Sequence, residues 1–434
     1  MIDASVPGLR LTDDAVASLE QIGQADLVVG IPSFNNADTI AHVARAVQTG
    51  MLKYFPECRS VLVNSDGGSK DGTREVVLGT ELADADRHLL RSPNGRPGRI
   101  VTEYEGIPGK GSAFRTIFYI AARLNAKACC VVDSDLRSIT PEWVNLLARP
   151  VYEQDFDYVS PMYRRHKFDG TITNSIVYPL TRALYGANLR QPIGGDFGFS
   201  GRLARAYLER DVWQSDVARF GIDIWMTTTA VAEGYRCCQA FLGAKVHNPK
   251  DPGADLSAML AQVVSAVFDL MSTYEAVWMA GREESSVPLF GEAPEATIDP
   301  VRVNVPRMVD AFQQGVRDLA DLYRQTLTEE TWNEVQSHAG DDATNITIPD
   351  RLWTRVIFDF ACSDRRRLFH RDQLLRSLTP IYLGRVASFV RECEDATAPQ
   401  VEERLAELCR VYREELPYLR ERWGVTHRSE EVPS

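Results

Sequence analysis

The sequence lacks the paired cysteines, the basic surplus and the targeting segments that mark several protein classes. Its eight cysteines include no C-x-x-C pair, which argues against a zinc or dithiol redox motif, so we expect most of them to be small core residues. With 60 acidic and 48 basic residues, the formal net charge is -12. This charge disfavours a nucleic-acid or anionic-membrane partner, because either would favour a basic face. Any anionic ligand must then be met by a local basic patch.

No secretory leader or membrane-length apolar run is apparent. The start, MIDASVPGLRLTDDAV, has no basic segment followed by an apolar one, and no stretch approaches the roughly 18 apolar residues of a membrane span. We therefore expect a cytoplasmic protein without a membrane span. There is also no internal repeat or low-complexity tract, so solenoid and fibrous architectures are not indicated.

Length and pattern predict two parts. A chain of 434 residues exceeds what one hydrophobic core usually supports. From residue 26, short apolar runs alternate with helical stretches, which favours an α/β fold with a mostly parallel sheet. Beyond about residue 254, apolar residues recur at helical spacing. We predict an α/β domain over residues 1–253 and a helical region over residues 254–434.

Polar residues follow the predicted strands. The strand in ADLVVGIPSF is expected to end near Pro32, and the strand in SVLVNSDGGS is expected to break at Asp66. The apolar run CCVV leads directly into Asp133 and Asp135, which return to the same side of an extended chain. Because open α/β sheets bind ligands beyond the carboxyl ends of their strands, these side chains are expected to converge there.

The carboxylate pair predicts a divalent metal. Mg²⁺ and Mn²⁺ prefer hard oxygen ligands, and Asp133 and Asp135 supply them, although a triplet of this kind can also cap a strand. His247 ends another predicted strand in AKVHNPK and could be a third ligand. Imidazole suits Mn²⁺ better than Mg²⁺, and the alternative for this histidine is a surface loop residue.

Three further segments could meet an anionic substrate. PGKGS sets Lys110 between two glycines before a helix, where backbone N–H groups and a cation could meet a phosphate. YRRHKFDG carries Arg164 and Arg165, whose guanidinium groups suit carboxylate or phosphate oxygens, or which form a solvated charge run. Asp223 opens an apolar helix in RFGIDIWM, either as its cap or as a carboxylate aimed into a cleft. The three glycines and one proline of QPIGGDFGFS, residues 191–200, predict a loop.

Taken in order, IPSFNN, NSDGGSKDGT, GKGSA and VVDSDL resemble the GT-A class of nucleotide-sugar glycosyltransferases. QPIGGDFGFS, FGIDIW and AKVHNPK look similar to the retaining enzymes that make glucosylglycerate and mannosylglycerate, or their 3-phosphoglycerate forms. The match covers roughly residues 26–250, and LLRSLTPIYLGRVASFV is similar too. The resemblance implies a GT-A, Rossmann-like mixed-sheet domain followed by a mostly α-helical region. It also implies a metal-dependent retaining hexosyltransferase that makes a compatible-solute glycoside.

The resemblance implies the binding residues of the donor nucleotide and of the metal. The nucleoside contacts would be Pro32, Ser33, Asn36 and Asp66. Lys110 would hold the diphosphate or the donor, and Asp133 and Ser134 would lie near the ribose or uracil. The ligands of Mg²⁺ or Mn²⁺ would be Asp135 and His247.

The resemblance also implies residues for the sugar and the acceptor. Gly194, Gly195 and Asp196 would line the donor-sugar pocket, and Asp223 would stand near the acceptor hydroxyl and the anomeric centre. The acceptor would be contacted by Thr173 and by Arg164 or Arg165. For retention we favour attack of the acceptor hydroxyl on the same face, with double displacement through Asp196 or Asp223 as the alternative.

The implied partners are a UDP- or GDP-hexose donor, a glycerate or 3-phosphoglycerate acceptor, and a second copy in a homodimer. The sequence does not choose between glucose and mannose or between the two acceptors. It also departs from the class pattern, with NSDGGS in place of DDGS and with Asp196 where some relatives have glutamate.

Other functions fit parts of the pattern. One is an inverting GT-A enzyme that acts on a polysaccharide or glycolipid, for which Asp223 could be the general base. A nucleotidyltransferase would usually carry a Gly- and Arg-rich loop after the first strand, which IPSFNNADT lacks. A non-catalytic nucleotide-binding protein with an assembly role for its helices is the alternative from a different class.

Overall fold

The structure is a computed structural model, and it describes residues 8–83, 86, 94–219, 221–246, 256–292 and 303–428. The chain forms two units. The sheet unit comprises Met1–Arg164, Leu189–Lys250 and Ser286–Thr297, and the helical unit comprises Arg165–Asn188, Asp251–Ser285 and Ile298–Ser434. The predicted fold class, a Rossmann-like mixed-sheet part and a mostly helical C-terminal region, is confirmed.

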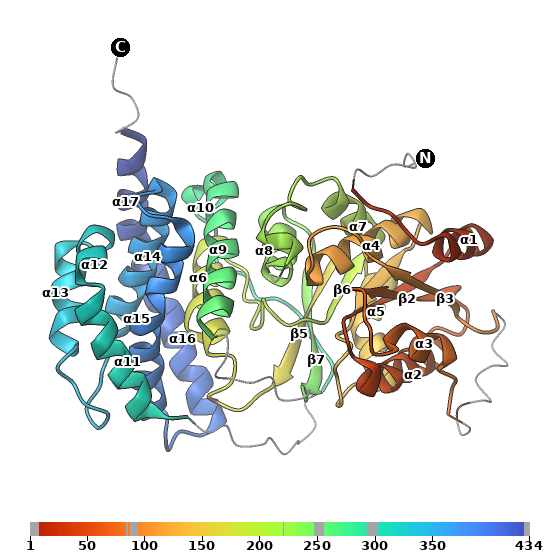
Figure 1. The fold of residues 1–434 in the computed structure, drawn as a ribbon, viewed down its shortest axis with the longest axis horizontal. Coiled ribbons are helices and arrows are strands. Elements are labelled where there is room, and N and C mark those ends of the chain that lie inside the picture. The colour runs from red at the N-terminus through yellow and green to blue at the C-terminus, as the bar shows by residue number, and fades with distance from the viewer. Residues whose placement is uncertain are drawn as a thin grey trace, which may run out of the picture. The chain divides into compact units, whose positions relative to one another are not determined.

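A mixed sheet forms the centre of the sheet unit (Figure 1). Its strands among the described residues are, in spatial order, β3 (Gly98–Glu103), β2 (Ser60–Asp66), β1 (Leu27–Ser33), β4 (Ala128–Val131), β6 (Phe197–Ser200), β5 (Tyr158–Arg164), β7 (Cys237–Ala244) and β8 (Leu289–Phe290). Strand β6 is antiparallel to β4 and β5, and the remaining pairs are parallel. The first residue of β6 therefore lies at the edge where its neighbours end.

Helices cover both faces of the sheet. One face carries α2 (Ala37–Tyr54), α3 (Thr73–Gly79) and α5 (Pro141–Gln154). The other carries α4 (Lys110–Arg123), α7 (Gly201–Leu208) and α8 (Ile222–Ala232), with the short turn η3 (Asp216–Ala218) packed on α4 and α8. Helix α1 (Asp13–Ile22) lies against β3. Both faces of the central strands are thus buried, which is why LVVGIPS and SVLVNSD read as continuous rather than alternating runs.

The two faces have different cores. The face of α2 and α5 is mostly aliphatic, with Ile40, Val43 and Leu147 among its buried residues. The face of α4, α7 and α8 holds interlocking aromatic rings, namely Phe114, Phe118, Phe199, Tyr207, Trp213 and Trp225. These rigid cores fix the strand ends on which the polar residues stand.

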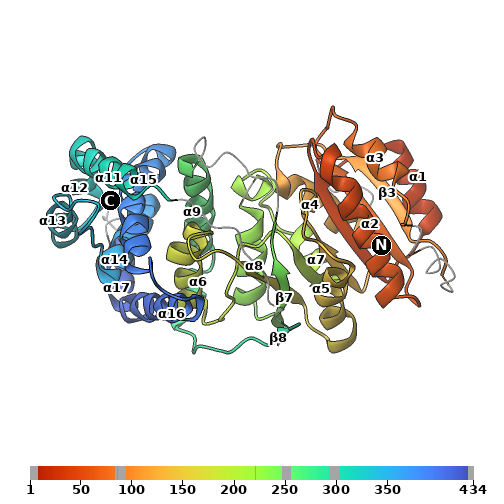
Figure 2. The same ribbon diagram turned by 90° about the horizontal axis from the view of Figure 1, so that it is seen from below.

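The helical unit consists of α6 (Tyr178–Tyr185), α9 (Leu256–Thr273), α10 (Glu275–Ala280), α11 (Val305–Asp318), α12 (Ala320–Thr326), α13 (Glu329–His338), α14 (Asp350–Arg366), α15 (Arg371–Glu392), α16 (Ala398–Glu414) and α17 (Leu416–Arg428), after a π-helical turn, η2 (Thr173–Val177). Helices α11 and α15 lie side by side (Figures 1 and 2). A Cβ atom on Gly315 would stand 2.2 Å from Cβ of Pro380, so glycine allows this approach.

The division into units differs from the predicted boundary at residue 253. Residues 165–188 belong to the helical unit. The carbonyl of Ser175, in the π-helical turn, accepts hydrogen bonds from Trp353 Nε1 at 2.8 Å and from the Tyr412 hydroxyl at 3.0 Å. These long-range contacts tie the segment to α14 and α16, and local sequence pattern does not report them.

One helix corrects the expectation about apolar runs. Within the described part of the chain, α9 is long and apolar enough to cross a membrane by length and composition, with a mean hydropathy of 1.4. In the structure, 56% of its residues are buried. Its only charged residue is Asp269, and most of its apolar side chains face the interior of the helical unit, as in the core helix of a globular protein.

Two predicted elements also change. The segment 191–200 was expected to be loop, but its last four residues form β6, the antiparallel strand of the sheet. The three glycines of the segment favour a loop in the sequence pattern. At Gly198, however, glycine is required by packing within the strand, because a Cβ atom there would lie 2.0 Å from the carbonyl oxygen of Leu147. The last predicted strand ends at Ala244 rather than at His247, and His247 lies outside the described residues.

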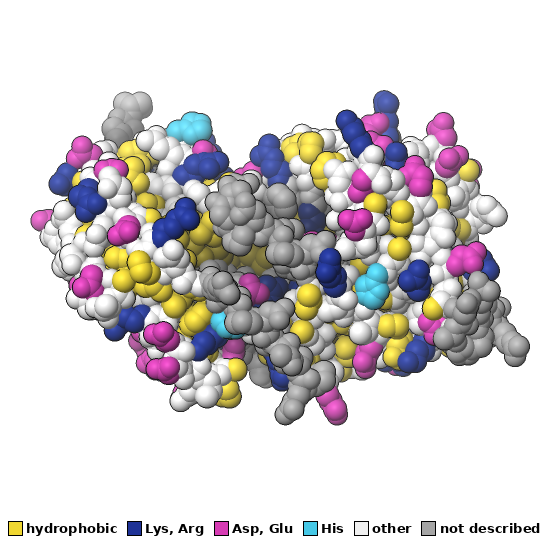
Figure 3. Space-filling model, turned by 60° about the horizontal axis from the view of Figure 1, so that its bottom comes forward, with side chains coloured by type: hydrophobic (Ala, Val, Ile, Leu, Met, Phe, Trp, Pro, Cys, Tyr) yellow, Lys and Arg dark blue, Asp and Glu magenta, His cyan; other side chains and the backbone are white. Residues whose placement is uncertain are grey.

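The surface agrees with the composition. On the face drawn in Figure 3, acidic and basic side chains of the described residues are intermingled with apolar ones. That face therefore presents mixed charge rather than one extended basic area.

Candidate functional site

Five charged side chains of the sheet unit meet at the edge where the parallel strands end. Asp133 follows β4, Asp196 precedes β6, and Lys245 follows β7, while Lys110 and Asp223 stand in the first turns of α4 and α8. We call this group the strand-end cluster. Its members come from five separate segments, so the fold rather than the local sequence brings them together.

The pairing of β4 with β6 sets the geometry. Val131 lies opposite Phe197, which brings the residues after β4 beside those before β6. The Asp133 N–H donates to Asp196 Oδ1 at 2.8 Å. Gly195 has a φ of 87°, and a Cβ atom on it would stand 2.3 Å from Asp133 Oδ2. The left-handed backbone and the close carboxylate both require glycine at this position.

Lys245 holds two carboxylates and one carbonyl. Its Nζ donates to Asp133 Oδ2, Asp196 Oδ2 and the Gly194 oxygen, each at 2.7 Å. Its side chain is 7% exposed. The sequence interpretation missed this lysine and singled out His247 in the same AKVHNPK segment. Lys245 lay inside the predicted strand, which was expected to run to His247, and a lysine near the end of an apolar run, at the edge already holding carboxylates, was the available signal.

Lys110 is held more loosely. Its Nζ lies 2.7 Å from Asp133 Oδ1, 3.4 Å from Asp223 Oδ1 and 3.3 Å from the Gly195 oxygen. A Cβ atom on Gly111 would stand 1.9 Å from the carbonyl oxygen of Val217, so this glycine serves packing against η3. The Gly111 N–H donates to the Arg219 carbonyl at 3.1 Å. The ammonium group, rather than that N–H, is therefore the part of the motif that faces the cluster.

Burial and neighbouring charges shift the pKa values of the three carboxyl groups in different directions. Burial would raise the pKa of the Asp133 carboxyl, but Lys110 and Lys245 outweigh it and hold that pKa well below its usual range. Burial raises the pKa of Asp196, against the opposing effect of Lys245, and it raises the pKa of Asp223 against that of Lys110. Burial alone would lower the pKa of Lys110, yet Asp133 and Asp223 raise it. Asp133 is thus the fixed anion, and Asp223 has the greater proton affinity.

The two residues predicted to be catalytic have different surroundings. Asp196 is completely buried, and it accepts bonds from the Asp133 N–H, Lys245 and the Tyr163 hydroxyl. The Asp223 side chain is 10% exposed, and its Oδ1 makes no hydrogen bond although Lys110 lies within ion-pair distance. Asp223 has acceptor capacity to spare, whereas Asp196 is enclosed by protein.

The predicted nucleoside residues lie at the same edge. Asp66 is fully buried and accepts from the Ser33 and Ser69 hydroxyls and from the N–H groups of Gly68 and Ser69. These four bonds fill both carboxylate oxygens, so Asp66 shapes the loop after β2. Pro32 lies buried within β1.

Asn36 links the first and fourth strand ends. Its Oδ1 accepts from the Ser134 hydroxyl at 2.8 Å and from the Phe34 N–H at 3.0 Å. The carbonyl of Ser134 in turn accepts from the Thr39 hydroxyl at 2.8 Å. The structure therefore joins Asn36 and Ser134, and nucleoside contact by either remains a prediction.

The predicted metal ligands are partly described. No group of three or more His, Cys, Asp or Glu side chains suited to a metal is found in the described residues, which exclude His247. Asp135 is half-buried in the turn after Asp133. The Arg137 N–H donates to the Val246 carbonyl at 2.8 Å, which ties the chain beside Lys245 to the turn that holds Asp135. A carboxylate at a strand end suits Mg²⁺ or Mn²⁺, which often take one or two carboxylates together with phosphate oxygens.

The predicted acceptor residues fall in both units. Arg164 ends β5 in the sheet unit, whereas Arg165 and Thr173 belong to the helical unit. Arg165 Nη1 lies 3.6 Å from Asp169 Oδ2, and Thr173 begins the π-helical turn. Their contact with an acceptor remains a prediction.

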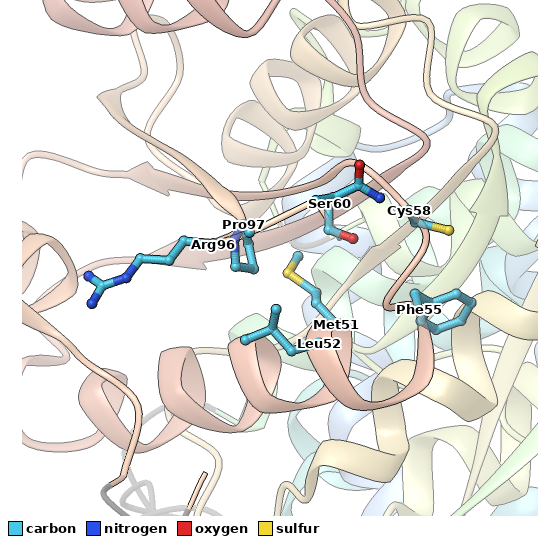
Figure 4. A pocket seen from close by; sticks show the side chains of 9 residues that line it. Met51, Leu52, Phe55, Cys58, Ser60, Arg96 and Pro97 are labelled. Carbon is cyan, nitrogen blue, oxygen red and sulfur yellow. The ribbon is translucent and has the colours of Figure 1, made fainter. Parts of the chain in front are cut away.

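Two hollows lie at the opposite edge of the sheet, where β2 and β3 begin. The one in Figure 4 has a volume of about 10 Å³, room for about one water molecule, and is lined by Met51, Leu52, Phe55, Cys58, Ser60, Arg96 and Pro97 among others. A neighbouring hollow of about 350 Å³ shares Leu52, Arg96 and Pro97 with it. Neither hollow is lined by a member of the strand-end cluster, so the candidate site and these hollows lie in different places.

Comparison with known proteins gives structural matches alone. No protein-family model matches the chain, and neither does any curated protein sequence. The chain is similar in structure to glucosyl-3-phosphoglycerate synthase.

The matches are distant. The synthase from Mycobacterium tuberculosis in complex with phosphoglyceric acid is 19% identical with a TM-score of 0.42, over 60% of this chain and 84% of that one. Its complex with Mg²⁺ and uridine diphosphate is 20% identical with a TM-score of 0.42, over 59% and 83%. A structure described as a mycobacterial protein is 22% identical with a TM-score of 0.43, over 63% and 85%. The function proposed below therefore rests on the side chains of the site.

Proposed function

We propose that this chain is a metal-dependent retaining glycosyltransferase. It would move glucose or mannose from a nucleotide diphosphate sugar to glycerate or 3-phosphoglycerate. The observation that carries the proposal is the strand-end cluster. In it the Lys110 ammonium, with one short contact, stands beside the under-bonded buried carboxylate of Asp223, and Asp135 follows Asp133 by two residues. Such a set can meet an anionic leaving group and a hydroxyl nucleophile in one place.

Each side chain has a chemical task in this proposal. Lys110 would bind the diphosphate of the donor and neutralise charge that develops as the bond to the sugar breaks. Asp135 and His247 would hold Mg²⁺ or Mn²⁺, which when bound supplies Lewis-acid neutralisation of the same leaving group. Asp223 would accept a hydrogen bond from the acceptor hydroxyl and so orient it toward the anomeric carbon.

The surroundings of Asp196 support attack on the same face over double displacement through that residue. A nucleophilic carboxylate needs a lone pair directed at the anomeric carbon. The oxygens of Asp196 are bonded to Lys245, to the Tyr163 hydroxyl and to the Asp133 N–H, and its side chain has no exposed surface. Asp196 would then shape the donor-sugar pocket together with Gly194 and Gly195.

The test is an activity matrix of donors and acceptors with Mg²⁺ and Mn²⁺, read by product mass and by anomeric coupling in NMR. UDP-glucose with phosphoglyceric acid is the first combination, because those ligands are named for the similar structures. The expected product keeps the anomeric configuration of the donor, and a chelator should abolish its formation. Full turnover in chelator, or no transfer in any combination, would contradict the proposal.

A matched pair of variants tests the metal site. Asp135→Ala should lower metal-dependent turnover at least 100-fold, as expected when a group that stabilises transition-state charge is lost. Asp372→Ala is the control, because Asp372 is exposed and pairs with Arg376 on the surface of α15. Equal activity of the two variants would remove Asp135 from the site.

One observation favours a second candidate, an inverting glycosyltransferase. The unbonded Oδ1 and raised pKa of Asp223 also suit a general base. Inversion of the anomeric configuration in the product would establish this alternative. A cytoplasmic location and a homodimer accompany both candidates as predictions, and light scattering on the purified chain checks the second.

A further inference from the structure

The two lysines of the strand-end cluster are bound in different ways. Lys245 makes three bonds of 2.7 Å to oxygen atoms of three residues, and its side chain is 7% exposed. Lys110 makes one contact of 2.7 Å and two that are longer than 3.2 Å, and its side chain is 18% exposed. An ammonium group has three N–H donors. Lys245 makes three short bonds, whereas Lys110 makes one short contact, to Asp133, and two longer ones.

Lys245 also adds side-chain bonds between segments that the pairing of β4 with β6 brings side by side. It stands one residue beyond β7. It bonds to Asp133, two residues beyond β4, and to Gly194 and Asp196, which precede β6. Asp196 is completely buried, and its oxygens are also bonded to the Tyr163 hydroxyl and the Asp133 N–H. Removing the charge of Lys245 would leave two close carboxylates, Asp133 and Asp196, without their common counter-ion.

We propose that Lys245 is a positioning residue, the fixed counter-ion that keeps Asp133 and Asp196 in place while Lys110 exchanges its carboxylate partners for an anionic ligand. The identity of that ligand as a nucleoside diphosphate rests on the proposed function. When Lys110 turns to the diphosphate, Asp133 keeps its bond to Lys245 and stays where it is. Asp223 loses its nearest cation and becomes available to a hydroxyl group.

This division of labour follows from charge balance. The five side chains carry three negative and two positive charges, so the cluster has a net charge of -1 before any ligand binds. If both lysines turned to the ligand, Asp133 and Asp196 would repel each other at the end of β4. Because Lys245 is anchored by the Gly194 carbonyl as well, it can stay in place when Lys110 leaves.

The first experiment compares Lys110→Met, Lys245→Met and the control Lys127→Met in donor kinetics and in titrations with UDP. Lys127 lies over the Tyr152 ring, away from the cluster. Lys110→Met should weaken nucleotide affinity at least 10-fold with a small change in melting temperature. Lys245→Met should lower kcat at least 10-fold and the melting temperature by about 5 °C or more, with a smaller change in UDP affinity. Equal effects of the two variants on affinity and melting temperature would overturn the proposal.

A double variant separates positioning from loss of folding. Lys245→Met with Asp196→Asn removes the buried charge together with its counter-ion, so the melting temperature should recover while kcat stays low. If the double variant is no more stable than Lys245→Met alone, Lys245 is not the counter-ion of Asp196 and the proposal fails. These stability measurements need no substrate. They therefore test Lys245 even if the chain transfers no sugar, and that result would contradict the proposed function alone.

Discussion

The two units each bury a cluster of ionic side chains, and the clusters differ in the kind of atom that is left without a hydrogen bond, which is Nε of Arg385 in the helical unit and a carboxylate oxygen of Asp223 in the sheet unit. In the helical unit, Arg385 and Arg404 place guanidinium nitrogens 2.6 Å from the two oxygens of Asp350, and Arg404 also lies 2.9 Å from Glu392. We call these four residues the arginine cluster. The strand-end cluster instead uses two lysines, and it leaves Oδ1 of Asp223 without a hydrogen bond.

The difference separates a structural cluster from one suited to exchange. Guanidinium forks match carboxylates in fixed geometry, and the arginine cluster joins α14, α15 and α16 in this way. Ammonium groups are compact charges that rotate among acceptors. An incompletely bonded buried carboxylate costs stability, so its place at a strand-end edge points to function rather than folding.

The largest expected effect is on the arginine cluster. Asp350→Ala leaves Arg385, which is 1% exposed, as a buried charge without its carboxylate. Breaking a buried pair from one side costs about 3 to 5 kcal/mol of unfolding free energy. Urea unfolding of the full chain measures this. A loss below about 1 kcal/mol, the range of exposed pairs, would contradict the structural assignment.

The next effect concerns glycines that admit no side chain. Gly195→Ala places a Cβ atom 2.3 Å from Asp133 Oδ2 at a φ of 87°. It should reduce turnover at least 10-fold and cost about 1 to 3 kcal/mol of stability. Gly79→Ala is the control, since a Cβ there meets nothing within 4 Å. Activity of Gly195→Ala equal to that of the control would show that the edge tolerates displacement.

Asp223→Asn is expected to lower activity without lowering stability, in contrast to a substitution in the arginine cluster. Burial raises the pKa of Asp223, so the fold loses stability as the pH rises from the unfolded-state pKa of about 3.9 to the folded-state pKa, and the loss is complete above the folded-state pKa. At pH 7 the variant should melt at or above the temperature of the wild type while its turnover falls at least 10-fold. The gain in melting temperature should shrink as the pH falls below the pKa of Asp223. A variant that melts lower than the wild type at pH 7 would contradict this assignment.

Asp350 should show the opposite pH dependence. Burial would raise its pKa, but Arg404 and Arg385 outweigh it and lower that pKa. Its stabilisation is therefore present above the unfolded-state pKa of about 3.9 and is lost as the pH falls through the folded-state value. The stability difference between wild type and Asp350→Asn should be constant from pH 7 to about pH 5 and should narrow as the pH falls below about 4. A difference that did not narrow would show that charge is not its source.

The smallest effect is expected on the surface. Asp372 and Arg376 form an exposed pair one turn apart on α15. Asp372→Asn should change the unfolding free energy by about 0.5 kcal/mol or less, with unchanged activity. A loss of several kcal/mol would mean that an exposed pair stabilises the fold as much as the arginine cluster does. Burial would then not explain the stability assigned to that cluster.

The two units also show which parts of the fold and of the candidate site could be predicted from the sequence. Strand ends such as Asp66 and Asp133 were predictable, because buried apolar runs stop at polar residues. The role of Lys245 was not, because it depends on β6 running antiparallel, and β6 lies in a glycine-rich segment that reads as loop. The placement of residues 165–188 in the helical unit was also hidden, since it depends on Trp353 and Tyr412.

The most direct test of the central claim is calorimetric titration of UDP and GDP, each with and without Mn²⁺, into the wild type and Lys110→Met. The account predicts metal-dependent binding of one nucleotide to the wild type, weakened at least 10-fold in the variant. Equal affinity in the two proteins, or an affinity that is the same with and without Mn²⁺, would contradict the claim that the strand-end cluster binds a nucleotide diphosphate.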